Sequence, residues 1–175
     1  MLEITAELEL KTIEERLKVK ITREVPISLY PFKDYFKGFE KVEAVRQIFG
    51  KRTDEVLNNL KVEFAGTRGY MGVNPLDGHV LIGANYLRNG DLVDIYLDII
   101  HELVHVRQFM DGKELFDDNF SYIDRPTELE AYRHTVDEAR RIGLNDDRIL
   151  QYLKTEWMTD EDVKSLARAL NIDCR

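Results

Sequence analysis

The sequence predicts an α+β fold, in which a small antiparallel or mixed sheet is followed by a buried helix, a second helix and a helical C-terminus. Two observations favour this class. Residues 61–90 contain apolar segments with strand-like alternation, separated by turns rich in glycine. Residues 91–111 are apolar almost all the way round a helix, which is typical of a helix in a protein interior. A chain of 175 residues suits one core, so we expect a single domain over residues 1–175.

The first part of the chain, residues 1–60, is expected to be mixed α/β. Its predicted elements are a helix within 1–18, a strand within 19–30 interrupted at Pro26, a turn at 31–34, a helix over 36–49 ended by Gly50, and a short helix capped by Thr53 and running to Leu57 or Leu60. Residues 61–90 are predicted to form a β-meander with strands at 61–65 and 79–83. Its edge strand would either pair with an extended substrate or have a purely structural role in the sheet.

The second part of the chain is predicted to be helical. The helix over residues 91–111 ends at Asp111 and Gly112, and a second helix over 125–143 has Pro126 in its first turn. Residues 145–172 are predicted to form two shorter helices, the last of them capped by Thr159.

The central motif is His-Glu-Leu-Val-His at residues 101–105, inside the apolar helix. Two histidines four residues apart lie about 40° apart around a helix and one turn apart along it, so both imidazoles can reach one ion. Glu102 stands beside them, within reach of a metal-bound water, which is the H-E-x-x-H arrangement of zinc hydrolases. A metal would satisfy these buried polar groups; the alternative is a pair of core histidines hydrogen-bonded to Asp94 and Asp98.

A catalytic zinc normally takes three protein ligands, so a third ligand is required. Asp111 lies six residues after His105, but a continuous helix would turn it away. On the helix over 125–143, Glu128 lies about 60° from the centre of the apolar face and Glu130 about 140°, so Glu130 points to solvent. His134 also lies on the exposed side. Glu128 is therefore favoured, and its alternative role is that of a first-turn acid that stabilises the helix dipole.

The buried motif, followed by a helix that starts Thr-Glu-Leu-Glu-Ala-Tyr, resembles the gluzincin class of zinc metallopeptidases, the thermolysin-like clan. The resemblance covers residues 91–142 and implies a zincin-like fold, a bound zinc ion and a peptide or protein substrate. It implies Glu102 as general base and the following metal ligands: His101, His105 and Glu128. One turn after Glu128 this chain has Tyr132, where thermolysin-like enzymes have an aspartate.

Several further residues have expected supporting roles. The oxyanion formed during hydrolysis usually needs an additional donor, and the candidates near the motif are Tyr122, Arg125, Tyr132 and His134. Asp98 would either accept a hydrogen bond from one of the two imidazoles or contact solvent at the cleft. His79, beside an Asp-Gly turn, is expected to be solvent-exposed.

The composition restricts the classes of partner. A net charge of −8 argues against nucleic acid or an anionic membrane surface. Cys174 is the only cysteine, which excludes an internal disulfide and a thiolate zinc cluster, and we expect it to be incidental. No apolar run is long enough for a membrane span and the N-terminus does not resemble a secretory signal, so we expect a cytoplasmic protein.

Two other classes of function remain open at the level of sequence. One is a binding or regulatory module that keeps zinc for stability alone, and the other is a metal-free helical adaptor. Neither the substrate nor the oligomeric state is predicted by the sequence.

Overall fold

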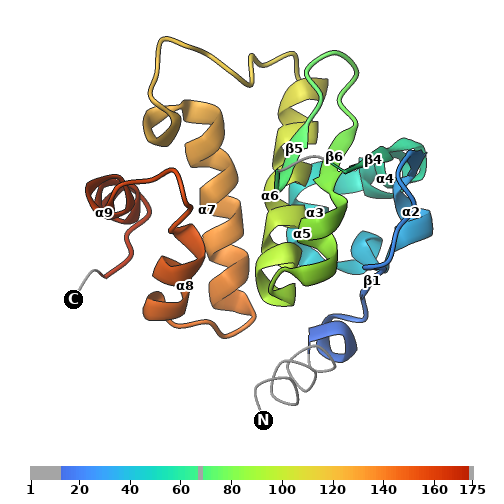
Figure 1. Ribbon diagram of the computed structural model, residues 1–175, viewed down its shortest axis with the longest axis horizontal. Coiled ribbons are helices and arrows are strands. Elements are labelled where there is room, and N and C mark those ends of the chain that lie inside the picture. Colours follow the sequence, from blue (N-terminus) through green and yellow to red (C-terminus); the bar gives the residue numbers. More distant parts are fainter. Residues whose placement is uncertain (1–12, 67–68, 174–175) are drawn as a thin grey trace.

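The computed structural model describes residues 13–66 and 69–173, and it has the expected α+β class with a small mixed sheet and a helical C-terminal part (Figure 1). Residues 13–17 are helical, as predicted, while the rest of the predicted N-terminal helix and Cys174 lie outside the described residues. The strands are β1 (Lys20–Ile21), β2 (Leu29–Pro31), β3 (Phe36–Lys37), β4 (Lys61–Ala65), β5 (Met71–Val73) and β6 (Val80–Gly83). The α-helices are α2 (Phe32–Tyr35), α3 (Glu43–Phe49), α4 (Thr53–Asn59), α5 (Ala84–Asn89), α6 (Leu92–Met110), α7 (Pro126–Arg141), α8 (Asp146–Leu153) and α9 (Asp160–Ala169). Short 3₁₀ turns are η1 (Phe39–Lys41), η2 (Gly50–Arg52) and η3 (Tyr122–Asp124).

The larger sheet has the strand order β2-β4-β6-β5, and β4 and β6 are parallel. The predicted β-meander is therefore wrong, because the chain leaves β4, forms β5 at the edge and returns to β6 in the interior. Burial explains the order: Val62, Phe64 and Ile82 are almost completely buried, so β4 and β6 take the interior positions. The short strand β5 is left as an edge, paired antiparallel to β6 only.

The N-terminal part departs most from prediction. The expected helix over 36–49 is confined to α3, because Gly38 has a φ of +85° and ends any helix that precedes it. The expected turn at 31–34 is the short helix α2 instead. Thr53 does not cap α4 with its side chain; its hydroxyl donates to the carbonyl of Gly50, one turn earlier.

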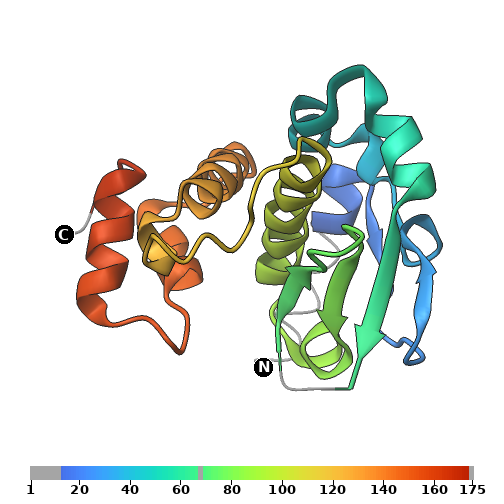
Figure 2. The same cartoon turned by 90° about the horizontal axis from the view of Figure 1, so that it is seen from above.

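Helix α6 lies between the sheet and α7, with α8 and α9 beyond α7 (Figure 2). It runs without interruption because apolar residues cover nearly all its faces, and the Asp91 carboxylate caps its first turn by accepting from the Asp94 amide. Pro126 begins α7 and the Thr159 hydroxyl caps α9, both as predicted. Within the described residues, no helix is both long and apolar enough to cross a membrane.

Candidate metal centre

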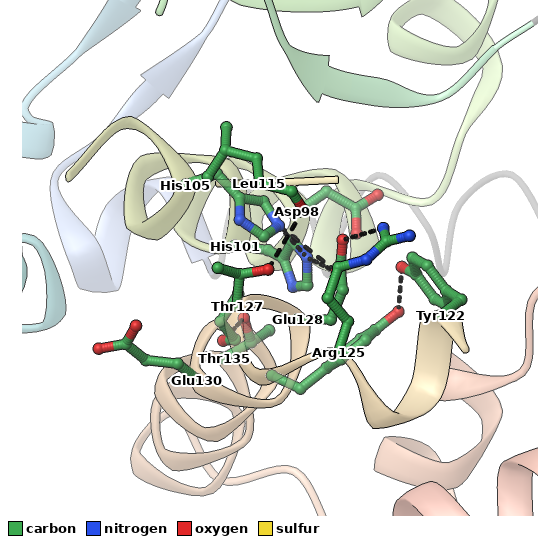
Figure 3. A network of polar contacts seen from close by, with 12 residues as sticks. Asp98, His101, His105, Leu115, Tyr122, Arg125, Thr127, Glu128, Glu130 and Thr135 are labelled. Atoms are coloured by element: carbon green, nitrogen blue, oxygen red, sulfur yellow. Dashed lines mark hydrogen bonds and ion pairs between the residues drawn. The ribbon is translucent and has the colours of Figure 1, made fainter. Parts of the chain in front are cut away.

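His101 and His105 project from α6 towards Glu128 on the facing helix α7 (Figure 3). Their potential donor atoms face one another. The His101 Nε2 atom is 3.1 Å from the His105 Nε2 atom, and the Glu128 Oε2 atom is 3.1 Å and 3.4 Å from those two nitrogens. All three side chains are buried. The α7 carboxylate that helix geometry favours is therefore the one that faces the histidine pair.

These distances fit a metal ion. Ligands placed tetrahedrally about 2.0–2.1 Å from zinc lie about 3.3 Å from one another. The three distances between donor atoms, 3.1, 3.1 and 3.4 Å, are close to that separation. Two neutral imidazoles and a carboxylate are also a suitable ligand set for a divalent transition metal. This buried group could therefore hold a metal ion.

Gln108 contacts the ring nitrogen of His105 that faces away from Glu128. Its Oε1 atom accepts from His105 Nδ1 at 2.7 Å, while its amide nitrogen donates to the Thr127 carbonyl at 3.0 Å and to Glu130 Oε2 at 2.7 Å. The side chain of Gln108 is completely buried. A protonated His105 Nδ1 leaves Nε2 free to face the centre, which is the tautomer a metal ligand needs.

Glu128, His101 and His105 shift one another's pKa values. Burial alone would raise the pKa of Glu128, but hydrogen bonds from His101 and His105 hold it well below its ordinary value. Burial opposes protonation of His105, yet Glu128 and the charge of Glu102 raise its pKa to about 9. Burial lowers the pKa of His101. The Glu128 carboxylate, buried against two imidazoles, thus favours a positive charge at this position.

Glu102 is buried beside the cluster, and its Oε2 atom has no hydrogen-bond partner among the described residues. Burial raises the pKa of Glu102 to about 8; the charge of His105 opposes this rise, and Glu128 and Asp98 add to it. Leaving a buried carboxylate oxygen unpaired costs stability, unless a ligand or water uses it. Glu102 is therefore available for a reacting molecule.

Two cavities meet at His101 and Glu102, and both side chains line both of them. The first cavity, of about 210 Å³, extends towards α8 and the segment after it. The second, of about 180 Å³, extends past Glu128 and is bordered by Met71, Gly72 and Val73 of the edge strand β5. A molecule lying across the centre could occupy both cavities at once.

Two of the expected oxyanion donors, Tyr122 and Tyr132, line the first cavity. The Tyr122 and Tyr132 hydroxyls are 2.9 Å apart, and the Tyr132 ring packs against the His101 ring with centroids 4.5 Å apart. Burial raises the pKa of both tyrosines, so both remain hydrogen-bond donors at neutral pH. Tyr122 also lines the second cavity, so it borders both cavities that Glu102 lines.

Of the two roles expected for Asp98, the hydrogen bond to an imidazole is not formed, whereas its place in the lining of the first cavity agrees with contact at the cleft. Its two oxygens accept from the Tyr86 and Tyr152 hydroxyls at 2.5 Å and 2.8 Å, and it forms no hydrogen bond with either imidazole. The His101 Nδ1 atom instead has no partner among the described residues. The alternative with core histidines bonded to Asp94 and Asp98 is also wrong, because Asp94 pairs with Arg148.

Other candidates lie outside the donor group. Asp111 is exposed at the end of α6, 4.0 Å from the Arg107 guanidinium. Glu130 was expected to point to solvent, but it is half-buried and accepts from Arg107, Gln108 and Lys113, which hold its pKa at about 2 although burial opposes this. His134 is also half-buried, because it packs near the same ion pair; burial lowers its pKa, and it lines neither cavity.

Two further expectations are settled by the contacts of single side chains. Arg125 lies behind the centre, with a guanidinium nitrogen 4.0 Å from Glu128 Oε1, on the side away from the histidines. His79 was expected to be exposed but is buried, because its two ring nitrogens contact the carboxylates of Glu63 and Asp77. Neither residue lines the two cavities.

Sequence reasoning missed Gln108 as a support for His105, and it missed Tyr86 and Tyr152 as partners of Asp98. The role of Gln108 could have been found from the sequence, because Gln108 lies on the same side of the helix as His101 and His105, among otherwise apolar residues. The tyrosines had no such signal, because α5 and α8 meet α6 only in the folded chain.

Searches against protein-family models, curated proteins and solved structures returned no match for this chain.

Proposed function

We propose that this protein is a zinc-dependent peptidase of the gluzincin type on a zincin-like scaffold. The observation that carries the proposal is the pairing of a three-donor group with an unpaired carboxylate. His101, His105 and Glu128 converge within 4.8 Å, and the free Glu102 oxygen lies beside them where two cavities meet. A purely structural metal site is normally closed by four protein ligands, whereas the group here offers three from the described residues.

His101, His105 and Glu128 would hold zinc, which when bound supplies an activated water and polarises the scissile carbonyl. With its unpaired Oε2 atom, Glu102 would accept a proton from the attacking water as the water oxygen bonds to the carbonyl carbon. It then gives the proton to the amide nitrogen as the carbon–nitrogen bond breaks, so that a free amine leaves. Gln108 keeps His105 in the tautomer that this arrangement needs.

Tyr122 is the favoured donor to the developing oxyanion. It lines both cavities, and burial keeps its hydroxyl protonated. Among the described residues, that hydroxyl has one side-chain hydrogen-bond partner, the Tyr132 hydroxyl, which can itself act as donor to it. Tyr132 lines one cavity, and its ring is committed to packing on His101. We assign Tyr132 the role of orienting Tyr122 and the imidazole.

The edge strand β5 offers a way to bind an extended peptide. Only one side of β5 is paired within the sheet, and Met71, Gly72 and Val73 border the second cavity. A peptide that adds as a further strand would bring its backbone past His101 and Glu102. This favours a peptide bond as the reacting group.

The Glu102→Gln variant tests the proposal against a site that holds zinc for stability alone. We expect the variant to bind zinc with the stoichiometry of the wild-type protein and to lose peptide hydrolysis, measured with a mixed library of fluorogenic peptides. The matched control is Glu114→Gln, an exposed acid outside the donor group, which should keep full turnover. Hydrolysis by Glu102→Gln at the wild-type rate would exclude Glu102 as general base. Absence of hydrolysis by zinc-loaded wild-type protein across the library would favour the non-catalytic alternative.

A further inference from the structure

We propose that the first cavity is a subsite for a cationic side chain, lysine or arginine, of the bound peptide, with Asp98 as its ionic partner. This inference rests on the proposed function, because it assigns a substrate preference to the same site. The cavity shares Met71, His101, Glu102, Tyr122 and Trp157 with the second cavity and continues to residues of α8 that the second does not reach, so its occupant would lie to one side of the scissile bond.

Aromatic side chains form a large part of the cavity wall, beside several charged ones. They include the side chains of Tyr70, Tyr86, Tyr122, Tyr132, Tyr152 and Trp157. Aromatic rings cover the aliphatic part of a long side chain well, and they attract a cation placed near their faces. A cavity of about 150 Å³ can hold a benzene ring, and the volume here is about 210 Å³. There is therefore room for the side chain of lysine or arginine.

Asp98 supplies a negative charge that the described residues do not neutralise. Its partners are two tyrosine hydroxyls, which fix the carboxylate but carry no positive charge. The basic groups nearby are already paired: Lys154, which itself lines the cavity, with Asp160, and Arg148 with Asp94. Each carboxylate oxygen has more than one lone pair, so both can accept a further donor.

Two further observations point to a ligand in this cavity. The Glu102 oxygen that lacks a partner belongs to a side chain lining it, and Glu102 is 8% exposed. Burial of Asp98 raises its pKa to about 6, so holding this charge in place costs the fold stability. Neutral residues of similar shape would avoid that cost, which favours a functional reason for the acid.

Trp157 provides a probe of binding, because it is the only tryptophan and lines the first cavity as well as the second; the Asp98 variant below assigns the signal to the first. We would titrate zinc-loaded protein with N-acetyl-lysine amide and with its uncharged analogue N-acetyl-norleucine amide, and follow Trp157 emission. A charge-assisted hydrogen bond at a partly buried site predicts that the lysine compound binds about 10-fold tighter or more. Equal affinity for the two compounds, or tighter binding of norleucine, would overturn the proposal.

Variants then assign the preference to Asp98. In Asp98→Asn the affinity ratio of lysine to norleucine should fall to within about twofold, because the charge is lost while an acceptor remains. Tyr152→Phe removes one hydrogen bond to Asp98 but retains its charge, so this variant should keep a preference for lysine. It serves as a second variant at the same site in case Asp98→Asn does not fold. The charge-matched control is Asp137→Asn on the exposed side of α7, which should behave as the wild type. A lysine preference that persists in Asp98→Asn would contradict the assignment.

Turnover separates this inference from the proposed function. Peptides that carry lysine, norleucine or glutamate at each position flanking the scissile bond would be compared by kcat/KM. Lysine should be favoured at one position, and Asp98→Asn should abolish that preference without abolishing hydrolysis. Hydrolysis with no preference for a cation would overturn the subsite alone. Selective binding of the lysine compound by a protein that hydrolyses no peptide would overturn the proposed function and leave the subsite standing.

Discussion

Gln108 shows how one buried side chain connects the candidate metal centre to the rest of the molecule. It accepts from His105 Nδ1 and donates to the Thr127 carbonyl at the start of α7. The same amide therefore fixes an imidazole on α6 and the backbone next to Glu128. Both ligand positions depend on this contact, because Thr127 and Glu128 are adjacent in the chain.

We expect Gln108→Leu to weaken zinc binding by about 10- to 100-fold, since His105 would lose the acceptor that fixes its orientation. The measurement is competition for zinc against a chromophoric chelator. Gln108→Glu keeps an acceptor for His105 and should bind zinc more tightly than the leucine variant. Equal zinc affinities for the leucine variant and the wild type would show that Gln108 does not orient the ligand.

Asp98 leads to a prediction about pH and stability in the absence of metal. Burial raises its pKa to about 6 in the folded protein, whereas an aspartate in an unfolded chain titrates near pH 3.9. The folded state thus binds this proton more tightly. The contribution of Asp98 to the free energy of unfolding is most favourable below about pH 4, and it is lost as the pH rises through 6.

The Asp98→Asn variant should therefore gain stability relative to the wild type as the pH increases. The difference in free energy of unfolding, variant minus wild type, should be more positive at pH 8 than at pH 4 by on the order of 2 kcal/mol. Urea denaturation in the presence of EDTA would measure it. A difference that is the same at both pH values would mean that the Asp98 pKa is not raised by folding.

At the scale of elements, α7 can approach α6 because its buried face carries small side chains. Ala131, Thr135 and Ala139 are completely buried and lie on the same side of α7 as Glu128. The Thr135 hydroxyl is satisfied within the helix by donating to the Ala131 carbonyl. This face determines the separation of the two helices and hence the distance from Glu128 to the histidines.

Ala131→Leu should push the two helices apart. We expect a loss of about 1–3 kcal/mol in the free energy of unfolding from overpacking, together with weaker zinc binding than the wild type. Arg133→Leu introduces the same side chain at an exposed position of α7 and should change stability by only about 0.5 kcal/mol. Both quantities can be measured by denaturation and zinc titration. An Ala131→Leu protein with unchanged zinc affinity would contradict the proposed role of this face.

The elements that sequence predicted well are those whose pattern is local and long. Helix α6 was evident from its continuous apolar character, and α7 and α9 from Pro126 and Thr159 at their starts. The facing of Glu128 followed from helix geometry alone. Elements of two to five residues near the N-terminus were not predictable in this way, because Gly38 interrupts a helical pattern without altering its apolar spacing. The parallel pairing of β4 with β6 was also not predictable, because it joins two strands that are separated in the sequence by β5.

At the scale of the whole molecule, the candidate metal centre joins two parts of the chain. Two of the candidate ligands come from α6, which packs against the sheet, and the third comes from α7, which lies with α8 and α9 on the other side of α6 (Figure 2). The cavities beside the centre likewise combine β5 with residues near α8. The tyrosine partners of Asp98 could not be predicted from sequence for the same reason, since they come from segments brought together only by folding.

Calorimetric titration of zinc into wild-type and Glu128→Ala protein tests the central claim most directly. We expect one zinc ion per wild-type chain and, in the variant, an affinity lower by about 100-fold or more, because one of three ligands is lost. The control is Asp111→Ala, which removes an exposed acid at the end of α6, the helix that carries His101 and His105. This variant should bind zinc as the wild type does. A wild-type protein that binds no zinc, or a Glu128→Ala variant that binds it equally well, would contradict the account.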